Sequence, residues 1–171
     1  SISKGGLEDR FSNIGLSLET IRRESLRLGS AVFGNGLERV ELDLITGPKE
    51  SSLGFVYAWQ FIHLRHGYEA LTAILEPNLA VRPSTLIVPT IKLKNLRQAN
   101  MVYGPTQTAI AKAIADELAS GIIPTKAMDE EVILVKITVH PKALDRRVLY
   151  KNTYQSMQKA IKQAFSPKET K

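Results

Sequence analysis

The chain has 171 residues, a formal net charge of +6 and no cysteine. Its length is most simply that of one domain, and the missing cysteines exclude disulfides, thiolate nucleophiles and cysteine-ligated metals. No apolar run approaches the roughly 18 residues that a membrane span requires, and the first residues lack the apolar core of a signal peptide. We therefore expect a cytoplasmic protein that makes no membrane contact.

The positive charge is concentrated at the C-terminal end. Residues 142–171 hold eight lysines and arginines against two acidic residues, a difference equal to the excess of the whole chain. Such a segment could bind RNA, yet aromatic and basic side chains do not alternate there as a base-stacking surface requires. The composition favours a solvated helix face, with an RNA-binding module as an alternative.

The first segment with a clear period covers residues 7–28. Apolar side chains recur there at a four-three spacing with charged residues between them, which predicts an amphipathic helix. We expect residues 1–28 to form a helical extension whose apolar stripe packs on its own domain or on a neighbouring subunit. A further possible role follows, that of a structural partner joining an oligomer through this extension.

A β-hairpin is predicted next, because the period changes to two. Ala31 to Phe33 and Leu37 to Thr46 are its expected arms, and Gly34-Asn35-Gly36 can supply the positive φ angles of a tight turn.

Two carboxylates share one face of the second arm. Glu41 and Asp43 are two residues apart, so both point away from the apolar face of Val40, Leu42 and Leu44. At that separation, ionisation of one carboxylate hinders ionisation of the other. The pattern alone leaves two interpretations open, a solvated face and a functional pair.

The middle of the chain is predicted to contain a helix and two strands. The expected order is a helix over residues 52–65, a strand over 68–75, a turn at 77–78 and a strand over 85–93. Pro89 cannot donate a ladder hydrogen bond, so the second strand lies at an edge or carries a bulge. His63 and His66 could share a helix face, but no further ligands accompany them, and we expect no metal site.

The stretch from Arg82 to Gln107 links this strand to a long helix. Gly104-Pro105 predicts the helix start, because proline is tolerated in the first turn, where its missing N–H would have no partner. Gln107 would then lie beside unpaired N–H groups at the positive end of the helix dipole. It could be an ordinary cap residue or could hold a polar ligand.

The last third of the chain is expected to hold a strand over Glu131 to His140, a helix over about Tyr150 to Phe165, and a disordered tail over residues 166–171. The mixed order of elements predicts an α/β fold of the α+β type. We expect a two-layer sandwich with helices on one side of a largely antiparallel sheet.

No P-loop, dinucleotide-binding, GxSxG or HExxH motif is present. Residues 29–165 instead resemble the formaldehyde-activating enzyme family. The segments that carry the resemblance are G-x-A-x-x-G-x-G at Gly29 to Gly36, D-L-I-x-G-P at Asp43 to Pro48, H-G at His66, P-N-L at Pro77, R-Q-A at Arg97, G-P-x-Q at Gly104 to Gln107 and G-I-I-P at Gly121 to Pro124.

The resemblance implies a function and an assembly. Members of the family condense formaldehyde with tetrahydromethanopterin to methylene-tetrahydromethanopterin and water, as part of one-carbon metabolism. The pterin is a substrate and no metal takes part. The implied fold is similar to the second domain of a small-subunit ribosomal protein, and the implied assembly is a homopentamer with pterin sites between subunits.

The family's substrate-binding residues correspond to five positions of this chain. Asp43 and Gln107 match the pterin-contacting aspartate and glutamine. A leucine of the pterin site falls at Thr72, and the family's lysine and threonine fall at Thr90 and Lys92, in exchanged order.

The proposed proton donor differs most. The family's histidine corresponds to Glu41, and dehydration of the carbinolamine requires a proton on the leaving oxygen. A carboxylic acid could supply it if burial and the charge of Asp43 kept Glu41 protonated, although Lys92 would oppose this. Two hypotheses follow: a catalyst with Glu41 as the acid, or a non-catalytic paralogue that binds a pterin or another carbonyl-reactive ligand.

Overall fold

The computed structural model describes residues 10–62, 71–76, 79–90 and 95–166. The strands are β1 (Arg27–Phe33), β2 (Val40–Pro48), β3 (Leu71–Thr72), β4 (Ile74–Glu76), β5 (Leu79–Ala80), β6 (Ser84–Pro89) and β7 (Glu131–Val139). The α-helices are α2 (Leu18–Arg23), α3 (Ser52–Ile62), α4 (Leu96–Met101), α5 (Gln107–Ala119), α6 (Ala127–Glu130) and α7 (Arg146–Phe165). Shorter helical segments are η1 (Ser12–Ile14), η2 (Gly36–Glu38) and the π-helical turn η3 (Val102–Thr106).

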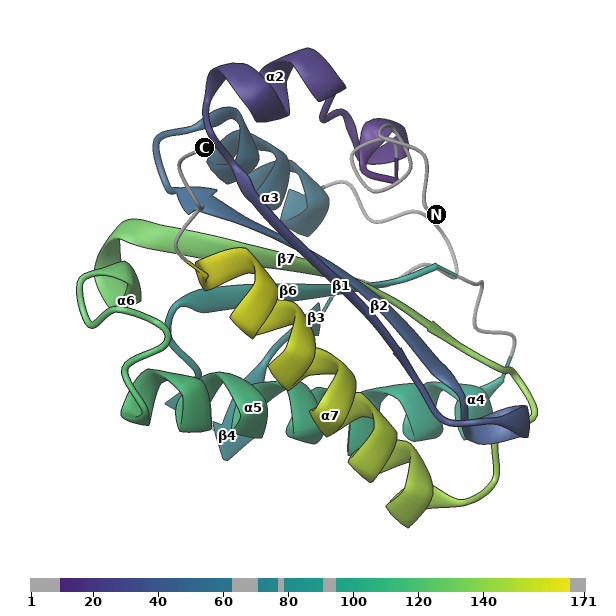
Figure 1. Cartoon of the computed structure of the whole chain (residues 1–171). Coiled ribbons are helices and arrows are strands. Elements are labelled where there is room, and N and C mark those ends of the chain that lie inside the picture. The colour runs from purple at the N-terminus through teal and green to yellow at the C-terminus, as the bar shows by residue number, and fades with distance from the viewer. Residues whose placement is uncertain (1–9, 63–70, 77–78, 91–94, 167–171) are drawn as a thin grey trace.

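The main sheet has the strand order β1-β2-β7-β6-β3 (Figure 1). Its neighbours pair antiparallel except β6 and β7, which are parallel, and β4 and β5 form a separate two-stranded sheet. The predicted α+β class and the largely antiparallel sheet are therefore confirmed. Pro89 ends β6 beyond its pairing with β3, which reaches only Leu86 and Ile87, so the proline breaks no ladder bond on that side.

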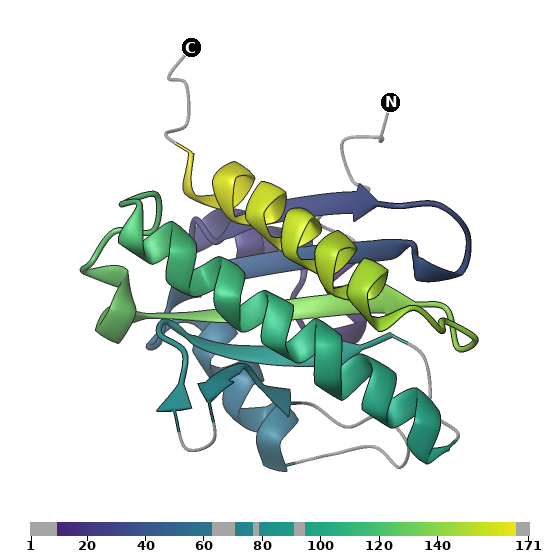
Figure 2. The ribbon, with the colours of Figure 1, turned by 90° about the horizontal axis from the view of Figure 1, so that it is seen from below.

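Helices cover both faces of the sheet, not one face as predicted. Figures 1 and 2 show α5 and α7 on one face, while α2 and α3 lie on the other. The physical reason lies in β7, whose two faces are both apolar: Ile133 and Val135 face one hydrophobic cluster, and Val132 and Leu134 face another. A strand that is apolar on both sides needs cover on both sides.

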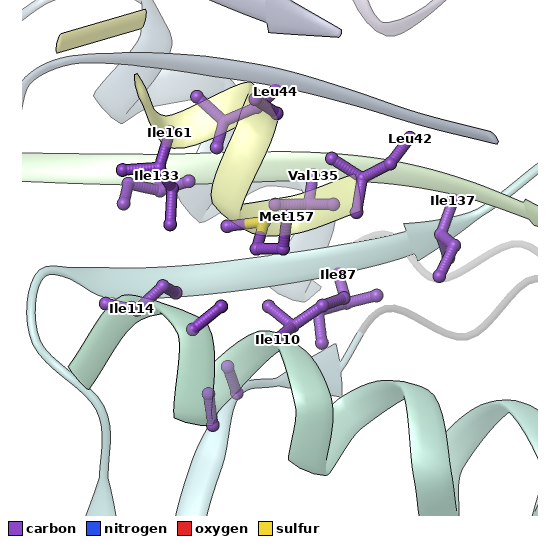
Figure 3. Packing of buried hydrophobic residues seen from close by; sticks show 14 of the residues in the cluster. Leu42, Leu44, Ile87, Ile110, Ile114, Ile133, Val135, Ile137, Met157 and Ile161 are labelled. Atoms are coloured by element: carbon purple, nitrogen blue, oxygen red, sulfur yellow. The ribbon is translucent and has the colours of Figure 1, made fainter. Parts of the chain in front are cut away.

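The larger cluster lies between the sheet and the pair α5 and α7. Figure 3 shows side chains of β2, β6 and β7 meeting those of the two helices. The predicted apolar face of β2 is confirmed, because Val40, Leu42 and Leu44 are buried. The apolar helix positions Ala109, Ile110, Ala113, Ile114, Met157 and Ile161 are also buried. This cluster is the main core of the domain.

The N-terminal segment builds the second cluster. The helix predicted over residues 7–28 is broken within its described part, because Gly15 adopts a left-handed φ of 95° after η1 and the Ser17 side chain caps α2. Phe11, Leu16 and Ile21 are 0%, 0% and 2% exposed and pack against β2, β7 and α3. The apolar stripe thus packs on its own domain.

The hairpin of β1 and β2 is confirmed, with a longer connection than predicted. The strands are joined by residues 34–39, which include η2 and two glycines with positive φ, Gly34 and Gly36. Asn35 keeps an extended φ of −126°, so no tight Asn-Gly turn forms. β1 begins at Arg27 and pairs with β2 up to Thr46.

The predicted helix start at Gly104-Pro105 is wrong. The helix begins at α4, where the Asn95 side chain accepts a hydrogen bond of 2.9 Å from the Gln98 N–H, and it continues through η3 into α5. The π-helical turn contains Pro105, a residue that would break a regular α-helix. Gln107 therefore lies inside the helix and not beside the unpaired N–H groups of its first turn.

Several predicted features lie outside the described residues. They are the pair His63 and His66, the turn at 77–78, Lys92 and residues 167–171 of the tail. In the described part of the chain, no helix has both the length and the apolar character needed to cross a membrane.

The first prediction concerns the contact of α7 with β1. A Cβ added at Gly29 would lie 2.0 Å from the backbone oxygen of Ala160, so Gly29→Ala should push helix and sheet apart. We expect a loss of about 3 kcal/mol in the free energy of unfolding, measured by denaturant titration. Gly36→Ala, with nothing within 4 Å but a φ of 67°, should cost roughly 1 kcal/mol. Equal losses would contradict the close packing.

The second prediction concerns the N-terminal segment. Phe11→Ala should lower the free energy of unfolding by about 3–5 kcal/mol, because it empties a fully buried position in the second cluster. Phe55→Ala is the matched control, since Phe55 is 71% exposed on α3 and its loss should change stability by no more than about 0.5 kcal/mol. A small effect of both substitutions would show that the segment does not belong to the folded core.

Candidate functional site

The described residues leave one half of the sheet face that carries α2 and α3 at least partly exposed. Toward Pro48, this face is closed by the second cluster, with Ile45, Val132 and Leu134 fully or nearly buried. Toward Val40, the positions on the same face are partly or fully exposed, and most of them are polar. We call this surface the open half of the sheet. It consists of Ser30, Val32, Glu41, Asp43, Val88, Thr90, Lys136 and Thr138, in the register of β1, β2, β7 and β6.

Asp43 and Lys136 form the inner row of the open half. They are direct partners in the antiparallel pairing of β2 and β7. The Asp43 carboxylate receives the Arg10 guanidinium at 2.6 Å, and its side chain is 17% exposed. The same guanidinium donates to the Ser30 hydroxyl at 3.3 Å. A residue of the N-terminal segment therefore holds the predicted pterin-contacting carboxylate.

Lys136 is held by the same segment. Its ammonium donates to the backbone oxygen of Arg10 and lies 5.9 Å from the centre of the Phe11 ring. Burial lowers the pKa of Lys136 below its ordinary value, and the nearby Arg10 charge acts in the same direction, while Asp43 opposes the change. Burial therefore makes the charged form of Lys136 less favourable, and the nearby Asp43 carboxylate offsets only part of this effect.

Glu41 belongs to the outer row of the open half, which also holds Thr138 and Thr90. Its register partner on β7 is Thr138, whose hydroxyl is 2.6 Å from that of Thr90. The Glu41 carboxylate makes an ion pair of 2.9 Å with Arg39, and its side chain is 47% exposed. The structure thus places Glu41, Asp43 and Thr90 on one surface.

The two carboxylates have separate cationic partners. Glu41 faces Arg39 and Asp43 faces Arg10, so neither presents an uncompensated negative charge to the other. Glu41 is half exposed beside Arg39, and Asp43 is mostly buried beside Arg10, so each carboxylate has its own compensating cation.

Thr72 and Gln107 form a second group. The Gln107 side-chain amide donates to the backbone oxygen of Thr72 at 2.7 Å, which ties α5 to the edge strand β3. Because α5 covers the sheet face opposite to α2 and α3, this group lies apart from the open half within one chain (Figures 1 and 2). The predicted site residues therefore fall into two groups, and Lys92 lies outside the described residues.

Sequence reasoning missed Lys136 and Thr138 of the open half, and it missed Arg10, which pairs with Asp43. Lys136 and Thr138 are the two polar positions of the face Val132-Leu134-Lys136-Thr138, and this break in an apolar strand was a usable signal. Arg10 gave no signal, because its pairing with Asp43 spans 33 positions and depends on the course of the N-terminal segment.

Two other features of the described residues do not define the site. No group of three or more histidine, aspartate or glutamate residues there could hold a metal ion. A hollow of about 530 Å³ lies at the other end of the sheet, lined by residues that include Arg27, Pro48 and Glu131. Its described lining includes none of the predicted site residues.

Comparisons with known proteins address the origin of this arrangement. The family model described as formaldehyde-activating enzyme matches residues 28–171. The bifunctional enzyme Fae/Hps of Archaeoglobus fulgidus is 39% identical over 139 residues, which are 81% of this chain and 35% of that protein. The protein of the same name from Methanothrix thermoacetophila is 39% identical over 138 residues, which are 81% of this chain and 35% of that protein. The one from Methanosphaera stadtmanae is 36% identical over 138 residues, which are 81% of this chain and 34% of that protein.

The match has a defined extent. The chain spans about a third of the length of these curated relatives, and the matched part takes in β1 to α7 but not the segment that carries Arg10 and Phe11. Because the family model covers most of the chain, the chain belongs to the formaldehyde-activating enzyme family.

Proposed function

We propose that this protein condenses formaldehyde with tetrahydromethanopterin to give methylene-tetrahydromethanopterin and water, as a carbon-nitrogen lyase. Family membership carries the proposal. The open half of the sheet supports it, because carboxylate, ammonium and hydroxyl groups gather there on rigid strands within one family-matched region. Such a surface can bind a polar, nitrogen-rich ring through several directed hydrogen bonds.

The chemistry requires positioning and one proton donor. An amine of the reduced pterin adds to formaldehyde to form a carbinolamine, which loses water to give an iminium ion. The second pterin nitrogen then attacks the iminium carbon and loses its proton, which restores the proton consumed in the dehydration. Holding both reactants makes the first step effectively intramolecular, and protonation of the hydroxyl lets water leave.

The roles of the residues follow from their places. Asp43 accepts hydrogen bonds from the pterin, and Thr90 contributes its hydroxyl from the outer row, where it lies 2.6 Å from that of Thr138. Glu41, at the position of the family's histidine, donates the proton once the bound pterin covers it. Covering the half-exposed carboxylate would remove the water that favours its ionised form.

The second group of residues supports a site between subunits. Thr72 and Gln107 lie on the other side of the sheet from Glu41 and Asp43 in one chain. In a homopentamer, as the resemblance implies, the Gln107 of one copy could meet the open half of the next copy. Lys92, the fifth inferred position, would act from the same site.

One observation favours a non-catalytic alternative. Glu41 is 47% exposed and paired with Arg39 at 2.9 Å, so its carboxylate faces water and a cation and not an enclosed pocket. A paralogue that binds a pterin or another carbonyl-reactive ligand without rapid turnover would tolerate this setting. Substitutions of Glu41 by glutamine and by histidine separate the two functions, as follows.

The third prediction concerns the proton donor. Wild-type protein should form methylene-tetrahydromethanopterin faster than the spontaneous reaction, and Glu41→Gln should lose about 10²–10⁴-fold of the excess rate, since an amide cannot donate the proton. The rate is measured with reduced pterin and formaldehyde, with a no-protein control. A background rate for the wild type together with activity in Glu41→His would identify the binding paralogue. Background rates for all three would contradict the proposed reaction.

The fourth prediction concerns the shared site. Asp43→Asn and Gln107→Ala should each lower the rate by at least tenfold, because each removes a pterin contact. If the site lies between subunits, mixed oligomers refolded from both variants should recover part of the activity, because some interfaces then contain neither substitution. Recovery in the mixture above the average of the two variants supports the shared site, and simple averaging contradicts it.

A further inference from the structure

Arg10 joins the open half to a segment that the family match does not include. Its guanidinium lies 2.6 Å from the Asp43 carboxylate and 3.3 Å from the Ser30 hydroxyl, while its backbone oxygen accepts from Lys136. The family model begins at residue 28. A part of the chain beyond the matched region therefore occupies both charged groups of the inner row.

The segment is anchored next to Arg10. Phe11 and Leu16 are fully buried, and Phe11 packs in the second cluster with Ile45 and Leu134. Moving the whole segment away would expose these apolar side chains to water, at a large cost. The Arg10 side chain itself is 39% exposed, so a ligand can displace it without removing the whole segment from the sheet.

We propose that Arg10 is an intramolecular competitor for Asp43, so that a reduced pterin must displace its guanidinium to bind. This inference rests on the proposed function, which assigns Asp43 to the pterin. A side chain of the N-terminal segment, outside the family match, then helps to set the affinity for the ligand. We call the contact of Arg10 with Asp43 the Arg10 latch.

The expected size of the effect is modest. A partly exposed ion pair contributes little to stability, and a competitor lowers apparent affinity by the fraction of time that the site is free. Opening the latch should therefore tighten pterin binding by about two- to tenfold. If Arg10 contacted the ligand instead, its removal would weaken binding.

Binding of tetrahydromethanopterin without formaldehyde tests the latch. Isothermal titration should give a Kd for Arg10→Gln that is about two- to tenfold lower than that of the wild type. Arg82→Gln is the matched control, because Arg82 makes a similar ion pair of 2.6 Å with Asp129, which does not belong to the open half. Its Kd should equal that of the wild type.

Hydrogen exchange provides a readout that needs no ligand. The amides of Ile14 and Leu16 both donate to the Phe11 backbone oxygen next to Arg10. A peptide covering residues 10–16 should exchange faster in Arg10→Gln than in the wild type. Pterin should also accelerate its exchange in the wild type, by taking Asp43 from Arg10.

The outcomes separate the two claims. A Kd for Arg10→Gln equal to or higher than that of a binding wild type overturns the latch and leaves the proposed function standing. If neither protein binds the pterin while residues 10–16 exchange faster in Arg10→Gln, the site is open and empty, and the proposed function is contradicted. A lower Kd for Arg10→Gln, with an unchanged Kd for Arg82→Gln, supports both the latch and the proposed function.

Discussion

The pairing of β2 with β7 is the interaction on which the rest of the structure depends. The two strands stay in register from Val40 opposite Val139 to Pro48 opposite Glu131, and they form the centre of the sheet. This register directs one set of side chains to α5 and α7 and the other set to α2 and α3. A slip of one residue would exchange the two sets and bury Glu41 and Asp43 in the main core.

The same register explains why one surface is both stable and polar. On the face of α2 and α3, the apolar positions of β2 and β7 lie at one end and the polar positions at the other, so cover is needed over only half of the face. The N-terminal segment and α3 supply that cover. The open half is thereby held on a rigid support, which is what a site for positioning two reactants requires.

Much of the fold could be predicted because its signals are local. The alternation along Glu131 to His140 identifies β7 and both its faces, and the helical period of Ala109 to Leu118 identifies the buried side of α5. The start of that helix could not be found from Gly104-Pro105, because η3 accommodates the proline inside a longer helix. The face covered by α2 and α3 depends on packing between distant segments, which period alone does not specify.

The candidate site divides in the same way. Glu41 and Asp43 share a face by strand geometry, so their proximity was predictable from a spacing of two residues. The cationic partner of Asp43 was not predictable, because Arg10 and Asp43 meet only through the tertiary fold. The polar break at Lys136 and Thr138 in β7 was visible in the sequence, but its significance depends on the pairing with β2.

Locating the bound pterin on the protein tests the proposed site most directly. Backbone NMR spectra of the protein titrated with tetrahydromethanopterin would report which residues the ligand affects. We predict chemical-shift changes at Glu41, Asp43, Lys136 and Thr138 on the open half, with further changes near Gln107 if the proposed site lies between copies of the chain. Changes confined to the opposite end of the sheet, around Arg27 and Glu131, would contradict the account.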